Sequence, residues 1–209
     1  MLADLKLGEF LDRLSSGVPT PGGGSASALA GALAASLGGM VCDLTLGKPK
    51  YEAARPELEK ARGILSGLRR DLQALVDRDA EAYDEVAKAM RLPKETPAQK
   101  SARKSALGKA TQFATEIPVK TAESCLAVLQ QVETVAEKGN LNAISDAGVA
   151  AQLAGAGIAG AALNVRINIG GLPDPDLAAR LEERIRRLET EAERILDRTR
   201  ETVSRRMKG

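Results

Sequence analysis

Apolar residues recur every three to four positions along almost the whole chain, and nowhere do they alternate with polar residues over a strand-length run. A 3.6-residue period is typical of an amphipathic helix, whereas alternation is typical of a strand. The sequence therefore predicts an all-α fold, a helical bundle. We expect one domain over residues 1–209, since two domains in this length would be cramped.

Glycine and proline residues mark most of the helix ends. Thr96 and Gln99 form a capping box with Pro97 at the first helical position. Pro118 lies inside the same helix, where it predicts a kink or a split. The six helices are expected from Leu7 to near Gly17, Ser25 to about Leu46, about Pro56 to Arg91, Pro97 to Lys138, about Ser145 to Ile169, and from Pro175 onward.

The second and fifth helices are unusually rich in glycine and alanine. Small side chains let helix axes approach closely, so we expect these two helices to cross at the centre of the bundle. Residues 26–46 also have the length of a membrane span. They are Ala, Gly and Ser rather than Leu, Ile and Phe, however, and Asp43 interrupts them. A buried helix in a soluble protein is therefore expected.

Composition narrows the classes of partner and site. Thirty basic against 28 acidic residues leave a net charge of +2, which gives no overall reason to expect nucleic acid or a membrane as a partner. The chain has no tryptophan and four other aromatic residues, too few for a base-stacking platform. With no histidine and two separated cysteines, no metal site is expected, and a reducing cytoplasm is the expected location.

One carboxylate interrupts the apolar stripe of the third helix. The stripe runs in steps of three and four from Leu58 to Leu75, continues at Asp79, and resumes at Ala82. Burying an ionised carboxylate costs several kcal/mol unless it is paired or protonated. Two interpretations stay open: a structural partner of a buried base, or a group with a raised pKa that transfers protons. The neighbouring Asp77 and Asp84 lie off the stripe and are expected to be solvated.

A glycine loop, Pro19 to Ser25, leads directly into the second helix. Three consecutive glycines allow positive φ and close approach of another molecule, and the first turn of a helix leaves N–H groups without partners. Together these features predict an anion site. The alternative is a flexible connection with Ser25 as the N-cap, because the loop lacks the signatures of the common phosphate-binding motifs.

A polar segment, Gly139 to Ala147, joins the fourth and fifth helices. Asn, Ser and Asp are ordinary N-caps, but one cap needs only one of them and this segment has four. Asn164 and Asn168 lie one turn apart on the otherwise apolar fifth helix. They face either a shared polar pocket or a buried structural network.

Five motifs in this order resemble the cyclodeaminase/cyclohydrolase family, which contains the C-terminal domain of formiminotransferase-cyclodeaminase and stand-alone bacterial methenyltetrahydrofolate cyclohydrolases. The resemblance covers roughly Leu7 to Asn168, and the last helix is generic. The motifs are Pro19–Ser25, Met40–Lys48, Val76–Tyr83, Leu92–Thr96 and Gly139–Asp146.

The resemblance implies a helical bundle that forms a homodimer, with a folate site near the glycine loop. It further implies that Asp79 is the catalytic residue, and that a tetrahydrofolate derivative is the substrate, with no separate cofactor. The candidate substrate-binding residues are Pro21, Gly22, Gly23, Gly24, Ser25, Lys48, Lys138, Asn140, Asn142, Ser145 and Asp146. Lys48 or Lys138 is expected to help the start of the second helix to bind the anionic glutamate tail of the folate.

The resemblance leaves two activities, both of which pass through a tetrahedral carbon between N5 and N10 of the folate. A cyclohydrolase adds water to the methenyl bridge, and a cyclodeaminase closes the ring and expels ammonia. We favour the cyclohydrolase, because this chain carries no formiminotransferase domain and its Met40–Lys48 and Asn140–Asp146 stretches look like the stand-alone enzymes. A non-catalytic folate-binding or helical interaction protein is the more remote alternative.

Overall fold

The computed structural model describes residues 1–208, and nearly all of them are helical. Six α-helices carry the fold, with three short 3-10 turns between or before them. The helices are α1 (Leu7–Ser15), α2 (Gly23–Thr45), α3 (Arg55–Met90), α4 (Pro97–Lys138), α5 (Ile144–Ile169) and α6 (Pro175–Lys208). The turns are η1 (Leu2–Asp4), η2 (Pro49–Ala54) and η3 (Leu141–Ala143). The all-α prediction is confirmed.

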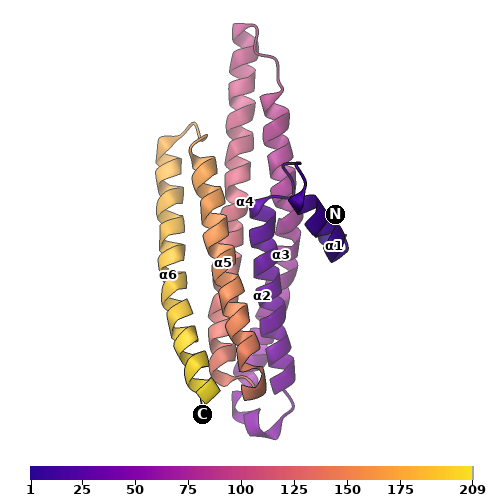
Figure 1. The fold of residues 1–209 in the computed structure, drawn as a ribbon. Helices are drawn as coiled ribbons and strands as arrows, with labels where there is room; N and C mark the ends of the chain where they lie inside the picture. Colours follow the sequence, from indigo (N-terminus) through magenta and orange to yellow (C-terminus); the bar gives the residue numbers. More distant parts are fainter. Residues whose placement is uncertain (209) are drawn as a thin grey trace.

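Helices α2 to α6 run alternately down and up, and short connections join them into one bundle (Figure 1). Each of α2, α3, α4 and α5 packs on two or more of the others, and α6 covers α4 and α5. Helices α3 and α4 are the longest, and their connected ends extend beyond the rest of the bundle (Figure 1). The start of α2 lies below this extension, so the glycine loop opens at the foot of a protruding helical hairpin.

The two small-residue helices do pack against each other, as the sequence predicts. A Cβ atom built on Gly157 of α5 would lie 3.0 Å from the carbonyl oxygen of Ser27 and 2.8 Å from Cys125 Sγ. Only a residue without a side chain allows the α5 backbone to come this close to α2. Cys42 and Cys125 are buried free thiols in this core, and burial raises the pKa of both.

Substitution of two helical glycines is expected to change stability in opposite directions. Gly157→Ala places a methyl group against backbone atoms that cannot rotate away, and we expect it to destabilise the fold by about 1–3 kcal/mol. Gly63 of α3 has open space around its Cα, so Gly63→Ala is expected to stabilise by up to about 1 kcal/mol through helix propensity. Urea unfolding of both variants checks this pair, and a Gly157→Ala protein as stable as the wild type would contradict the close α2–α5 packing.

Pro118 lies within an unbroken α4, so the expected split is wrong. A proline at position 118 removes the N–H that would bond the carbonyl of Ala114. The side chain of Asn168 on α5 supplies the missing donor, since its Nδ2 donates to the Ala114 carbonyl oxygen at 2.9 Å. Asn168 therefore has a structural role, and α4 continues through the proline.

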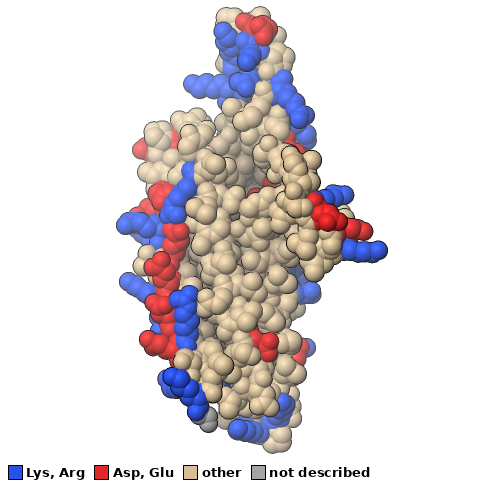
Figure 2. Space-filling view, viewed as in Figure 1, with Lys and Arg blue, Asp and Glu red and all other residues tan. Residues whose placement is uncertain are grey.

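Two helices, Gly23–Thr45 and Leu141–Ile169, are long and apolar enough to cross a membrane by length and composition alone. The most apolar windows of the two segments are 56% and 50% buried inside the bundle. The remainder forms an apolar surface on one side of the α2–α5 pair. Figure 2 shows this side as a broad area almost free of charged side chains, between the charged α6 and the other edge of the molecule.

Candidate functional site

The carboxylate of Asp79 lies against the first turn of α2. A Cβ atom built on Gly24 would lie 2.0 Å from Asp79 Oδ1, so the carboxylate occupies the space that a side chain at position 24 would need. The hydroxyl of Ser25 donates to Asp79 Oδ2 at 3.0 Å, and the Ser25 backbone N–H also hydrogen-bonds to the carboxylate. Asp79 thus closes the start of α2, where N–H groups lack helical partners.

The side chain of Asp79 is half-buried, and burial raises its pKa above the ordinary value of an aspartate. The two hydrogen bonds from Ser25 favour the charged form and partly offset the effect of burial. No ion pair to Asp79 occurs within residues 1–208, whereas many other carboxylates of the chain pair with an arginine or lysine. Of the two interpretations left open by the sequence, a raised pKa without a cationic partner fits the proton-transfer role.

Asp77 is buried, so the expectation that it is solvated is wrong. Its carboxylate accepts hydrogen bonds from the backbone N–H groups of Leu2 and Ala3, and thereby fixes the N-terminal turn η1 to α3. Asp84 is exposed, as expected. The two carboxylates on either side of Arg78 therefore have different partners. Asp77 binds the N-terminal segment, and Asp79 lies against the start of α2.

The glycines of the loop serve close approach rather than positive φ. Gly22 is the N-cap of α2 with φ of −128°, and Gly23 and Gly24 are already helical. Among the described residues, Gly47 is the one glycine with positive φ, so the expectation of positive φ in the loop is wrong. The expectation of Ser25 as the N-cap is also wrong, because α2 already begins at Gly23. Pro21, Gly24 and Ser25 are buried, whereas Gly23 is exposed. Among the described residues, no hydrogen bond occupies the N–H of Gly23 or Gly24.

Asn164 of α5 also lies against the start of α2. A Cβ atom on Gly23 would lie 3.4 Å from Asn164 Nδ2, which itself donates to the carbonyl of Gly160 at 2.8 Å. Three helices therefore meet here: α2 offers free N–H groups, α3 a carboxylate and α5 a side-chain amide. Above this point the molecular surface is hollowed, between the α3–α4 extension and the adjacent ends of α5 and α6 (Figure 2).

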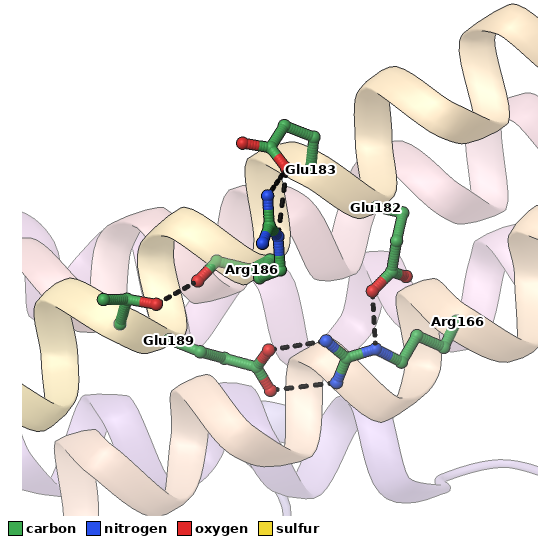
Figure 3. Close-up of polar contacts among 6 residues, drawn as sticks. Arg166, Glu182, Glu183, Arg186 and Glu189 are labelled. Atoms are coloured by element: carbon green, nitrogen blue, oxygen red, sulfur yellow. Dashed lines mark hydrogen bonds and ion pairs between the residues drawn. The ribbon is translucent and has the colours of Figure 1, made fainter.

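Arg78, the residue before Asp79, is exposed, and its guanidinium lies over the ring of Phe113 at 5.6 Å from its centroid. Arg166 follows Asn164 by two positions and pairs with acidic residues of α6. Figure 3 shows it bonded to Glu182 and Glu189 of α6, with Nε to Oε1 of Glu182 at 3.1 Å and a two-pronged contact to Glu189. This ion cluster fixes the ends of α5 and α6 that border the hollow.

The second group of predicted site residues lies at the opposite end of α2. Lys48 follows the C-terminus of α2, and Lys138 pairs with Glu57. The 23 residues of α2 span about 33 Å. Within one chain, therefore, Lys48 and Lys138 lie too far from the N-terminus of α2 to assist it. Their role in substrate binding stays a prediction.

Asn140 is buried, and the protein itself satisfies its hydrogen-bonding groups. Its N–H donates to Thr45 Oγ1 at 2.8 Å, and its Nδ2 donates to the Leu44 carbonyl at 3.2 Å. Its Oδ1 accepts from the Asn142 N–H and lies 3.4 Å from the Tyr51 hydroxyl. Asn140 thus joins the C-terminus of α2 to the segment before α5.

Asn142 and Ser145 are exposed at this end, and Asp146 is half-buried. Arg206 of α6 supports the same segment by donating to the carbonyl oxygens of Ala136 and Gly139. The polar segment that the sequence singles out is therefore partly structural. Its exposed members form a second polar surface, about 33 Å from Asp79 along α2.

The larger cavities lie away from Asp79. One of about 670 Å³ runs between α2 and α3, with Ser36, Asp43, Arg62 and Arg69 in its lining. Another of about 630 Å³ lies between α5 and α6. Within residues 1–208, no group of three His, Cys, Asp or Glu side chains is placed to hold a metal ion. Within one chain, the Asp79 site is an open notch at the start of α2.

Comparison with known proteins agrees with this arrangement. The family model for formiminotransferase-cyclodeaminase matches residues 6–187. A methenyltetrahydrofolate cyclohydrolase of Methylorubrum extorquens is 46% identical over 197 residues, which are 93% of this chain and 93% of that protein. A formimidoyltransferase-cyclodeaminase of Sus scrofa is 33% identical over 193 residues, 90% of this chain but 36% of the longer pig protein.

Among solved structures, the crystal structure of a formiminotetrahydrofolate cyclodeaminase from Thermotoga maritima superimposes with a TM-score of 0.88. The sequence identity is 28%, and the match covers 98% of each chain. The bundle, including the last helix that carries no motif, is therefore shared over its full length.

Proposed function

Since the chain belongs to the formiminotransferase-cyclodeaminase family, we propose that it is a methenyltetrahydrofolate cyclohydrolase. The proposed reaction is the reversible hydrolysis of 5,10-methenyltetrahydrofolate to 10-formyltetrahydrofolate. The observation that carries it is the half-buried Asp79 carboxylate, which lies at the free N-terminus of α2, has a raised pKa and has no cationic partner among residues 1–208. The 46% identity to a cyclohydrolase over nearly the whole of both chains supports the choice of reaction.

The geometry suggests how the chain would carry out this reaction. The methenyl bridge is a cationic carbon between N5 and N10, and the ionised Asp79 stabilises that charge. Asp79 takes a proton from the attacking water as the new C–O bond forms, which gives a tetrahedral carbon. The same proton then goes to N5 as the C–N5 bond breaks. The hydroxyl oxygen on the carbon forms the C=O bond and releases its proton to solvent, and the formyl group stays on N10. A raised pKa suits both steps, since the group must accept and release a proton near neutral pH.

A formiminotetrahydrofolate cyclodeaminase is the second candidate, and the 0.88 TM-score to a protein of that name favours it. Here the same carboxylate would take the proton from N10 as it attacks, and would return it to the departing ammonia. Purified protein is mixed separately with methenyl- and formimino-tetrahydrofolate. Loss of the methenyl chromophore with no ammonia release supports the hydrolase, ammonia release supports the deaminase, and binding without turnover contradicts both.

We further propose that the active form is a homodimer joined through the exposed face of α2 and α5. Large apolar side chains are exposed along both helices, among them Leu33, Met40 and Leu44 of α2 and Val149, Leu163 and Ile167 of α5. Two helices about 10 Å wide and about 33 Å long present roughly 650 Å² in projection, near the ~800 Å² per partner of a stable interface. A second copy fits this face, because a two-fold axis matches one uncharged surface with itself.

Such a dimer also accounts for the two separated groups of predicted site residues. A two-fold axis near the middle of α2 reverses its direction, so that the Asn142–Asp146 end of one copy lies beside Asp79 of its partner. The open notch would then be closed by Asn142, Ser145 and Asp146 of the second copy. Ligand pockets commonly enclose most of the surface of a small molecule, which the open notch of one chain does not do here.

A charge on this face is expected to separate the two chains. Leu163 is 67% exposed, so Leu163→Glu leaves the core of each chain intact but places two carboxylates in the proposed interface. We expect a monomer by light scattering, with turnover reduced at least 10-fold. Met90→Glu, at a 56% exposed position on the α3–α4 extension, is the matched control and is expected to remain dimeric. A Leu163→Glu protein that stays dimeric, or a fully active monomer, would contradict the proposal.

A further inference from the structure

The hydroxyl group of Ser25 has two acceptors and only one proton. Its Oγ lies 2.9 Å from the carbonyl oxygen of Val76 and 3.0 Å from Oδ2 of Asp79. Both distances are those of good hydrogen bonds, but a serine hydroxyl donates to one acceptor at a time. Ser25 is completely buried, so it does not reach a ligand in the hollow. Its role must therefore be exercised through Asp79.

The two acceptors correspond to the two protonation states of Asp79. An ionised carboxylate is the stronger acceptor, so the Ser25 hydroxyl donates to Oδ2 when Asp79 is charged. A protonated Oδ2 is itself a donor, and it needs an acceptor in the same place. The oxygen of Ser25 then accepts that proton, while its own hydrogen rotates to the carbonyl of Val76. In either state each polar hydrogen has a partner, and no heavy atom needs to move.

We propose that Ser25 is a positioning residue that exchanges hydrogen-bond partners, from Asp79 to Val76, each time Asp79 takes up a proton. Its predicted role as a substrate-binding residue is replaced by this one. The exchange itself depends only on the geometry of Ser25, Val76 and Asp79. Its place in turnover rests on the proposed function, because a general acid–base group must occupy both protonation states in every cycle.

The other charged groups around Asp79 have partners of their own. On α3, Asp77 accepts from the N-terminal backbone and Arg78 lies over Phe113 of α4. On α5, Arg166 is bonded to Glu182 and Glu189 of α6. α2 has no charged residue in its first turn. Burial and the two hydrogen bonds from Ser25 therefore set the balance between the two states of Asp79.

Removal of the hydroxyl is expected to shift this balance in a known direction. Ser25→Ala removes a donor to the charged form, so the pKa of Asp79 should rise further. The carboxyl ¹³C resonance of Asp79 measures this pKa without any substrate. In the wild type the carbonyl ¹³C resonance of Val76 should titrate with the same midpoint, because it gains a hydrogen bond when Asp79 is protonated. In Ser25→Ala it should lose most of its pH dependence.

Catalysis should change in the same direction. We expect kcat of Ser25→Ala to fall about 10-fold with KM nearly unchanged, because the carboxylate loses an orienting bond that no substrate contact replaces. The acid limb of the pH–rate profile should move to higher pH, in step with the Asp79 titration. A purely structural role would lower the melting temperature without moving that limb.

Ser27→Ala is the matched control. Ser27 is a buried hydroxyl on the same helix, but it donates to the carbonyl of Gly23 at 2.7 Å and does not contact Asp79. Its removal should leave the Asp79 titration, the Val76 resonance and the pH–rate profile as in the wild type. If Ser25→Ala does not fold, Ser25→Cys keeps the volume with a weaker donor, and the same shifts should appear at smaller size.

An unchanged Asp79 pKa in Ser25→Ala, or a Val76 resonance that does not follow Asp79 in the wild type, would overturn the partner exchange. Absence of turnover in the wild type would instead contradict the proposed function. The two results are separate, because both resonance titrations are carried out on the protein without substrate.

Discussion

Asp79→Asn is expected to abolish most turnover while the protein still binds folate. The amide keeps the size and an acceptor oxygen, so the start of α2 stays closed by the side chain at position 79. It does not exchange a proton near neutral pH, and a positioned acid–base group contributes about 10²- to 10⁴-fold. We therefore expect kcat to fall by about that factor, measured as the loss of methenyl absorbance, with Kd for the folate within a few-fold of the wild type. A fully active variant would refute the assignment.

The same variant gives an independent pH readout. Burial raises the pKa of Asp79 in the folded state above its unfolded value, so ionisation costs more in the folded protein. This cost appears as pH rises through the ordinary pKa of about 4 and is complete above the raised pKa. The asparagine side chain does not ionise, so the Asp79→Asn variant has no such cost. Relative to Asp79→Asn, the wild type should therefore lose stability as pH rises above about 4, as measured by urea unfolding at several pH values. A difference that is constant with pH would contradict the raised pKa.

Gly24→Ala is expected to have the second largest effect. The new methyl group would lie 2.0 Å from Asp79 Oδ1 and 2.5 Å from its carboxyl carbon, so the carboxylate must leave its place. Alanine favours the helix, and the displaced group is the end of a side chain, so we expect little loss of stability. A displacement of about 1 Å in a catalytic group costs on the order of 10²-fold in rate. Steady-state kinetics should show this loss in kcat.

Gly39→Ala is the control on the same helix, because a Cβ atom at position 39 meets nothing within 4 Å. It should leave kcat unchanged and raise stability slightly. If Gly24→Ala were as active as Gly39→Ala, the position of the Asp79 carboxylate against α2 would not matter for the reaction.

The sequence predicts the fold well because helix periodicity and helix ends are local signals. The predicted and observed ends of α3 differ by one residue, and those of α2 by two at most. Asp79 was identifiable for the same reason, since a carboxylate in an otherwise apolar stripe stands out by its register. The closeness of α2 and α5 follows from their small residues and is also confirmed.

The parts of the site that depend on tertiary contacts could not be predicted from the sequence as well. No local sequence signal distinguishes Asp77 from a solvated acid, because its partners are N–H groups 74 and 75 positions away. Asn168 serves a carbonyl freed by Pro118 of another helix, and that link requires the packing of α5 on α4. The sequence predicts that another molecule approaches the glycine loop, whereas in the structure the group that approaches Gly24 is the carboxylate of Asp79.

Which motifs lie together in space also could not be predicted from the sequence. The Gly139–Asp146 segment and the glycine loop both match the family pattern, and a single pocket was the natural expectation. The length of α2 places them about 33 Å apart in one chain. The proposed homodimer would bring them together.

A crystal structure of the Asp79→Asn variant with a stable folate, 5-formyltetrahydrofolate, bound would test directly whether Asp79 lies at the reacting atoms. The N5 and N10 atoms should lie within hydrogen-bonding reach of the side chain at position 79, in the hollow over the start of α2. A folate bound in the groove between α2 and α3 beside Arg62 and Arg69, with position 79 empty of ligand, would contradict this placement.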